Sequence, residues 1–238
     1  MGKKIIIENL QFLFTVDEND TVIRDASIVV EDSFISDIGP TIEVYARHER
    51  SSFDLVKDGS MLGMCPGFID SHVHLSETLS RGVFPDNLNT RAWVFHWAKP
   101  FYAFITPEDE YYGALLGTTE MLRAGTTCFL DMGSQYDPGI TVKAMRKTGI
   151  RGITGRHAAD NKPEEIPRGW SQEMVKHHFY PNAETALADL EKCVKKYNGA
   201  LDGRVRCWVN IEGKEPCSLA LHVGARELSE KLGVGTTY

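Results

Sequence analysis

Two histidines separated by one residue, His72 and His74, are the residues of this sequence best suited to do chemistry. They end the stretch Pro66–His74, which the pattern predicts to be a short strand. Side chains alternate along a strand, so Asp70, His72 and His74 share one side. Two neighbouring imidazoles can present two nitrogens to one cation, and such a pair suits zinc or another transition metal. Two half-buried histidines in a polar pocket are the alternative interpretation.

The segment Pro-Gly-Phe-Ile-Asp-Ser-His-Val-His, residues 66–74, resembles the first-strand signature of the metal-dependent amidohydrolase superfamily. Residues 120–128, Glu-Met-Leu-Arg-Ala-Gly-Thr-Thr-Cys, resemble the start of the second strand in its chlorohydrolase and aminohydrolase branch. Two such matches are more specific than one. The branch includes purine and pyrimidine deaminases, triazine dechlorinases and dealkylases, and thiocarbamate or phenylurea herbicide hydrolases such as molinate hydrolase.

The resemblance implies that His72 and His74 bind a divalent metal ion, with zinc as the first candidate and cobalt, iron or manganese as alternatives. It also implies that histidines from strands five and six and an aspartate from strand eight complete the site. Those ligands, and the general base, would lie beyond Tyr238. Some members bridge two metals through a residue of strand four, and Glu212 and Lys214 stand at about that place.

Residues 65–238 alternate between strand and helix patterns, which predicts a parallel sheet with helices packed on it. Thr106, Pro138, Asn182 and Ser218 mark the starts of four helices. The later strands are expected at 126–132, 150–156, 204–211 and from 234 onward. The predicted fold class is therefore α/β, the N-terminal part of a (β/α)8 barrel that ends near strand five. An open doubly wound sheet is the alternative, although no Gly-x-Gly-x-x-Gly turn follows any strand.

Residues 1–64 are predicted to form a separate small β-domain. Two alternating runs, Ile5–Thr15 and Val22–Ile38, flank a polar turn and indicate antiparallel strands. Residues 40–64 are expected to connect this domain to the barrel. The resemblance implies that strands from the far C-terminus complete the domain.

The segment Leu75–Ile105 is too long for an ordinary connection and is rich in aromatic residues. As a lid it would enclose an apolar pocket, to which Trp93, His96, Trp97 and, from strand three, His157 are expected to contribute. Residues 91–99 could also form a short helix packed on the barrel, and both interpretations can hold together. The pair His177 and His178 is expected to be exposed in a loop.

The composition excludes several kinds of partner. The net charge of −7 without a Lys/Arg cluster argues against nucleic acid, and no apolar run is long enough for a membrane span. Five cysteines without a Cys-x-x-Cys motif indicate reduced thiols in a cytoplasmic protein. We expect a homo-oligomer that acts on a small, uncharged substrate.

These observations predict a hydrolase of non-peptide C–N bonds that uses metal-activated water. An apolar xenobiotic amide, urea, carbamate or thiocarbamate is the preferred substrate class, and a nucleobase-type deaminase is the alternative. A second hypothesis is that the chain is a catalytically incomplete fragment, or half of a nicked enzyme, that needs the remaining C-terminal half as its partner. A non-enzymatic binding module is the third.

Overall fold

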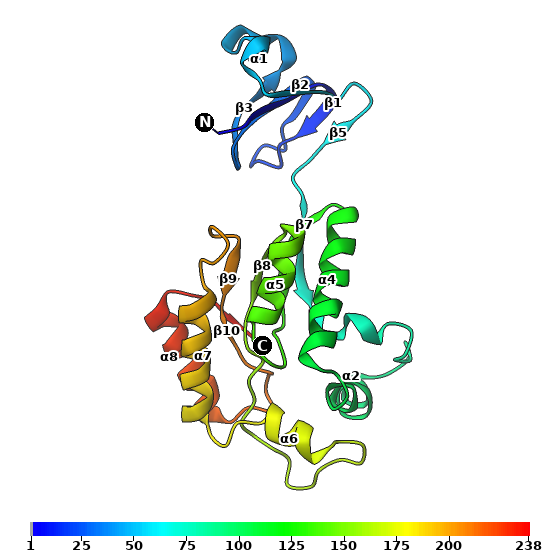
Figure 1. The fold of residues 1–238 in the computed structure, drawn as a ribbon, viewed down its shortest axis with the longest axis vertical. Coiled ribbons are helices and arrows are strands. Elements are labelled where there is room, and N and C mark those ends of the chain that lie inside the picture. Colours follow the sequence, from blue (N-terminus) through cyan, green and yellow to red (C-terminus); the bar gives the residue numbers. More distant parts are fainter. Residues whose placement is uncertain (1) are drawn as a thin grey trace. The chain divides into compact units, whose positions relative to one another are not determined.

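The computed structural model describes residues 2–238 and shows two compact units, one ending at Gly67 and the other running from Phe68 to Tyr238 (Figure 1). The sequence-based boundary after residue 64 lies a few residues before this division. Each unit has its own buried apolar clusters.

The first unit is built on a five-stranded sheet. Its strands are β1 (Lys4–Phe14), β2 (Val22–Glu31), β3 (Phe34–Pro40), β4 (Leu55–Asp58) and β5 (Gly63–Met64). The antiparallel pairing of β1 with β2 was predicted and is confirmed, and β3 adds to β2 in the same sense.

The prediction that residues 40–64 only connect two domains is wrong. They form α1 (Thr41–Arg47), a 3-10 turn at Arg50–Ser52, and the strands β4 and β5, which both pair parallel with β1. These two strands are too short for an alternating pattern to show, because they have only four and two residues.

The second unit contains a parallel sheet, as the sequence predicts. Four of its strands pair side by side in the order β6-β7-β8-β9. Two further strands, β10 and β11, pair with each other, also in parallel. The strands of this unit are β6 (Phe68–Val73), β7 (Thr126–Asp131), β8 (Arg151–Thr154), β9 (Val205–Cys207), β10 (Val209–Asn210) and β11 (Thr236–Thr237).

The four helices that the sequence predicts, starting at Thr106, Pro138, Asn182 and Ser218, are all present. Thr106, Asn182 and Ser218 each accept a hydrogen bond from the backbone N–H three residues later, and Gly149 and Gly233 end their helices in the left-handed conformation. The α-helices are α2 (Thr90–Trp93), α3 (Lys99–Tyr102), α4 (Pro107–Arg123), α5 (Gly139–Thr148), α6 (Gln172–His178), α7 (Ala183–Tyr197) and α8 (Leu219–Leu232).

The long segment after β6 is largely helical. A 3-10 helix covers Leu75–Ser80, and a π-helical turn at Val94–Ala98 joins α2 to α3 into one continuous element, residues 90–102, which we call the aromatic helix. The expectation of a short packed helix at residues 91–99 is confirmed.

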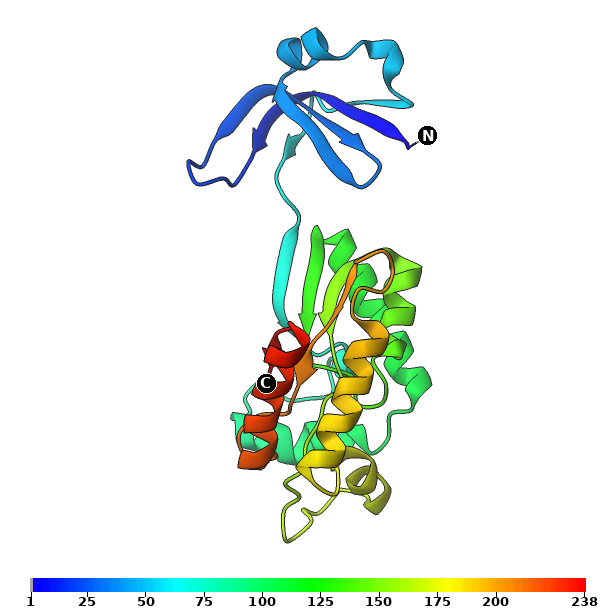
Figure 2. The ribbon, with the colours of Figure 1, turned by 90° about the vertical axis from the view of Figure 1, so that its left-hand side faces the viewer.

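Helices α4, α5 and α7 lie on one face of the parallel sheet (Figure 2). Between them and the strands lie buried side chains such as Leu75, Phe129 and Met145. Strand β6 is an edge strand of this sheet, and its side chains Phe68 and Ile69 are exposed to 62% and 71%. The segments that follow the strands, including α2 and α6, gather at the strands' C-terminal ends (Figure 1).

The close approach of two strand ends depends on Gly155. A Cβ at this position would lie 2.7 Å from the carbonyl oxygen of Trp208 and 2.9 Å from Cβ of Asn210. We predict that Gly155→Ala lowers the free energy of unfolding by about 1–3 kcal/mol, because backbone must move. Urea denaturation measures this. In the control Gly39→Ala, the nearest atom is the end of the flexible Arg47 side chain; equal losses in the two variants would contradict the prediction.

Candidate active site

A cavity of about 180 Å³ lies at the C-terminal ends of the parallel strands. Side chains from five strand ends, those of β6, β7, β8, β10 and β11, and from the aromatic helix converge on it. Its lining includes His72, His74, Trp93, Lys99, Tyr102, Met132, His157, Asn210, Glu212 and Tyr238. The sequence-predicted histidine pair therefore opens into a cavity that is also lined by residues distant in the chain.

A buried aspartate fixes the backbone that carries the two histidines. Asp131, at the end of β7, accepts hydrogen bonds from the Leu75 N–H at 3.1 Å and from the Thr154 hydroxyl at 3.0 Å. A register shift between Asp70 and Val73 interrupts the alternation of β6. The rings of His72 and His74 nevertheless stay neighbours, with centroids 5.3 Å apart.

His74 is half-buried and His72 is exposed. Nδ1 of His74 is shielded from solvent and makes no hydrogen bond within residues 2–238, and Oε1 of Glu77 lies 3.5 Å from it. Burial lowers the pKa of His74, so its ring is neutral near pH 7 and keeps a lone pair for a cation.

This arrangement fits one part of a zinc site. Neutral imidazoles are ordinary zinc ligands, and catalytic zinc takes about three protein ligands. Within residues 2–238, no group of three or more His, Cys, Asp or Glu side chains is placed to hold a metal ion. The described chain thus offers two ligands, His72 and His74, rather than a closed site.

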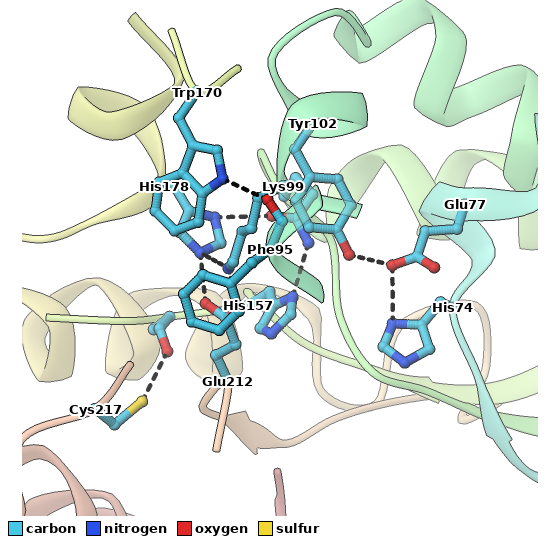
Figure 3. A network of polar contacts seen from close by, with 12 residues as sticks. His74, Glu77, Phe95, Lys99, Tyr102, His157, Trp170, His178, Glu212 and Cys217 are labelled. Atoms are coloured by element: carbon cyan, nitrogen blue, oxygen red, sulfur yellow. Dashed lines mark hydrogen bonds and ion pairs between the residues drawn. The ribbon is translucent and has the colours of Figure 1, made fainter. Parts of the chain in front are cut away.

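A buried ion pair forms the opposite wall of the cavity (Figure 3). The Lys99 ammonium donates to Oε1 of Glu212 and also contacts Nε2 of His178, which lies against Oε2 of the same carboxylate. Burial lowers the pKa of Lys99, and burial also lowers that of His178 to about 4. Burial alone would raise the pKa of Glu212, but its two partners hold it well below the usual range.

Gln135 links this wall to His157. Its amide nitrogen donates to Nδ1 of His157 at 2.7 Å, and its Oε1 lies 3.1 Å from Nδ1 of His178. Burial keeps the pKa of His157 well below its usual value, so the ring is neutral. With Nδ1 accepting, its proton is on Nε2.

The structure brings some of the predicted site residues together and not others. His72, His74, Trp93, His157 and Glu212 line one cavity. His96 and Trp97 do not line it. Trp97 packs against Phe84, as Trp93 does, and His96 is exposed. Lys214 is exposed and borders a separate, larger pocket.

The expectation that both His177 and His178 are exposed is wrong for His178, which is 1% exposed. The two residues end α6, whose buried side chains are Met174, Val175 and His178. This spacing is the inward stripe of a helix, and it was the signal in the sequence that could have identified His178. His177 is exposed, with its ring against Tyr136.

Four further polar residues of this region were not predicted from the sequence. They are Glu77, Lys99, Tyr102 and Gln135. None carries a local motif, and Lys99 stands in an otherwise aromatic run. Their side-chain hydrogen-bond partners lie 22 or more residues away, so a local pattern could not reveal them; only the contact of Glu77 with His74 is local.

A family model described as the amidohydrolase family matches residues 64–237 of this chain. Among curated relatives, the 5-methylthioadenosine/S-adenosylhomocysteine deaminase of Syntrophomonas wolfei is 27% identical over 232 residues, which cover 98% of this chain and 48% of the relative. The chain spans about half the length of the curated relatives that it matches.

Two solved structures share the fold. A triazine hydrolase from Arthrobacter aurescens aligns with a TM-score of 0.82 and 20% identity, over 99% of this chain and 52% of that one. An atrazine chlorohydrolase from Arthrobacter aurescens TC1 complexed with zinc aligns with a TM-score of 0.77 and 20% identity, over 98% of this chain and 52% of that one.

Glu110, on α4, holds the loop that carries Gln135. Its carboxylate accepts from the Ser134 hydroxyl and from the Gln135 N–H, both at 2.7 Å. Burial raises the pKa of Glu110 to about 7. The folded state therefore binds this proton more tightly than the unfolded chain does. The resulting stabilisation is present below about pH 4.5 and is lost as the pH rises through 7.

We predict that Glu110→Gln, which imitates the protonated carboxyl, gains stability relative to the wild type as the pH rises from about 4.5 to 7. The shift in pKa corresponds to a gain of about 3 kcal/mol. Unfolding free energies of both proteins across this range measure it. A difference that stays constant with pH would contradict the prediction.

Proposed function

Since the chain belongs to the amidohydrolase family, we propose that the full-length protein is a metal-dependent hydrolase of carbon–nitrogen bonds other than peptide bonds. One observation carries this proposal: His72 and His74 open together into a cavity at the C-terminal ends of parallel strands. That end of a β/α barrel is where active sites lie.

His72 and His74 are the residues of this chain that would hold the metal ion. Zinc is the first candidate, because imidazole suits it and a solved structure with this fold is complexed with zinc. When bound, the metal supplies a Lewis acid that makes hydroxide available from water near neutral pH.

The remaining ligands and the general base would come from residues beyond Tyr238, in the second half of a barrel. The same residues would cover the bare edge at Phe68 and Ile69, since parallel sheets are normally buried on both faces. This part of the proposal rests on the family and on the half-length match to the relatives.

The chain's own residues would bind and orient the substrate. The Nε2–H of neutral His157 can donate a hydrogen bond to a substrate acceptor, while Trp93 and Met132 supply apolar walls. Glu212 already uses both carboxylate oxygens on Lys99 and His178. Because each oxygen already faces a buried partner, we favour a single metal ion over a second ion bridged by Glu212.

We propose an aminated heterocycle as the substrate, which would lose its amine by hydrolysis. The deaminase relative matches nearly the whole chain. The cavity of about 180 Å³ is smaller than the 300–1,000 Å³ of typical ligand pockets, so it would hold the reacting end of the molecule. An apolar xenobiotic amide, urea or thiocarbamate is the second candidate, favoured by the aromatic cluster of Phe84, Trp93, Trp97 and Phe101.

Removal of either histidine tests the metal assignment. We predict that His72→Ala and His74→Ala each weaken zinc binding by the full-length protein by at least about 100-fold, since even supporting residues of metal sites contribute 10- to 100-fold. Zinc content after dialysis against a chelator measures this. His96→Ala is the matched control, because His96 is exposed and does not line the cavity. Zinc retained by both site variants would refute the assignment.

A substrate panel tests the reaction. We expect the zinc-loaded full-length protein to release ammonia from adenosine-type nucleosides with a higher kcat/KM than it shows for aryl ureas or thiocarbamates. Coupled ammonia detection and chromatography of the products give both values. The reverse order would select the xenobiotic substrate class, and inertness toward both classes would contradict the proposed function.

A further inference from the structure

Glu77 is a buried carboxylate next to the histidine pair. It lies in the 3-10 helix that follows His74, and its side chain is 9% exposed. Oε1 accepts a hydrogen bond from the hydroxyl of Tyr102 and lies 3.5 Å from Nδ1 of His74 (Figure 3). Both neighbours are in the second unit, and Tyr102 comes from the aromatic helix.

Folding alone does not explain a carboxylate at this place. Burial of a charged group is costly unless partners compensate it. Among the described residues, the ion-pair contact of Glu77 is with His74, not with a lysine or arginine. Its one side-chain hydrogen bond comes from Tyr102, which is itself buried. The distinctive feature of this carboxylate is therefore that it is directed at His74.

The orientation of His74 is equally specific. Nδ1 is shielded from solvent, is directed at Glu77, and has no hydrogen-bond partner in the structure. With Nδ1 directed at Glu77, Nε2 is the nitrogen that remains for a ligand. Histidines that bind metals commonly donate their other ring N–H to a carboxylate, which fixes the tautomer and the ring orientation.

We propose that Glu77 and Tyr102 are positioning residues for His74, an inference that rests on the proposed function. Glu77 accepts the Nδ1–H of His74 and thereby leaves the lone pair on Nε2, directed at the metal. Tyr102 donates to Glu77 and holds the carboxylate in place. The aromatic helix is thus coupled to the metal ligand through one hydroxyl group.

The test measures zinc affinity of the full-length protein by competition with a chromophoric chelator, together with thermal stability. We expect Glu77→Gln to weaken zinc binding about 10- to 100-fold. Tyr102→Phe, which removes only the hydroxyl, should weaken zinc binding by a smaller factor. This variant still tests the proposal if Glu77→Gln does not fold. In the wild type loaded with zinc, nitrogen NMR of the His74 ring should show the proton on Nδ1.

Tyr180→Phe is the matched control. The Tyr180 hydroxyl also donates to a carboxylate, that of Asp189, which does not line the cavity. It should lower stability and leave zinc affinity unchanged. If Glu77→Gln and Tyr102→Phe also lose only stability, the positioning role is wrong, while loss of zinc in His74→Ala would still uphold the proposed function. Zinc retained in both His72→Ala and His74→Ala would instead overturn both.

Discussion

The buried ion pair between Lys99 and Glu212 is the interaction on which the cavity most depends. Its partners are 113 residues apart in the chain, and His178 joins them from a third segment. Removing one member of such a pair costs about 3–5 kcal/mol, because the other charge is left buried and unpaired. The pair therefore fixes the aromatic helix, α6 and the end of β10 around one space.

The aromatic helix connects the two sides of that space. Lys99 points to Glu212 on one wall, and Tyr102, three residues later, points to Glu77 and the histidine pair on the other (Figure 3). Residues three apart lie on the same side of a helix, so one short element holds both polar groups over the cavity. Asp131 fixes the other side of the histidine pair, because its carboxylate links the backbone after His74 to the ends of β7 and β8.

Local patterns in the sequence predicted what local physics determines. The capped helix after Thr106, the parallel strands and the pairing of His72 with His74 all follow from spacing over a few residues. The buried network does not follow from such spacing. Lys99 is paired with the carboxylate of Glu212, which only folding brings near it. The strands at residues 40–64 were missed for the same reason, since their partner is the distant β1.

The position of the metal ion itself directly tests whether His72 and His74 bind it. Anomalous diffraction at the zinc edge, from crystals of the zinc-loaded full-length protein, locates it without reference to activity. We expect a peak about 2.0–2.1 Å from one ring nitrogen of His72 and one of His74. A zinc-loaded crystal with no peak between these rings, or with the rings turned apart, would contradict it.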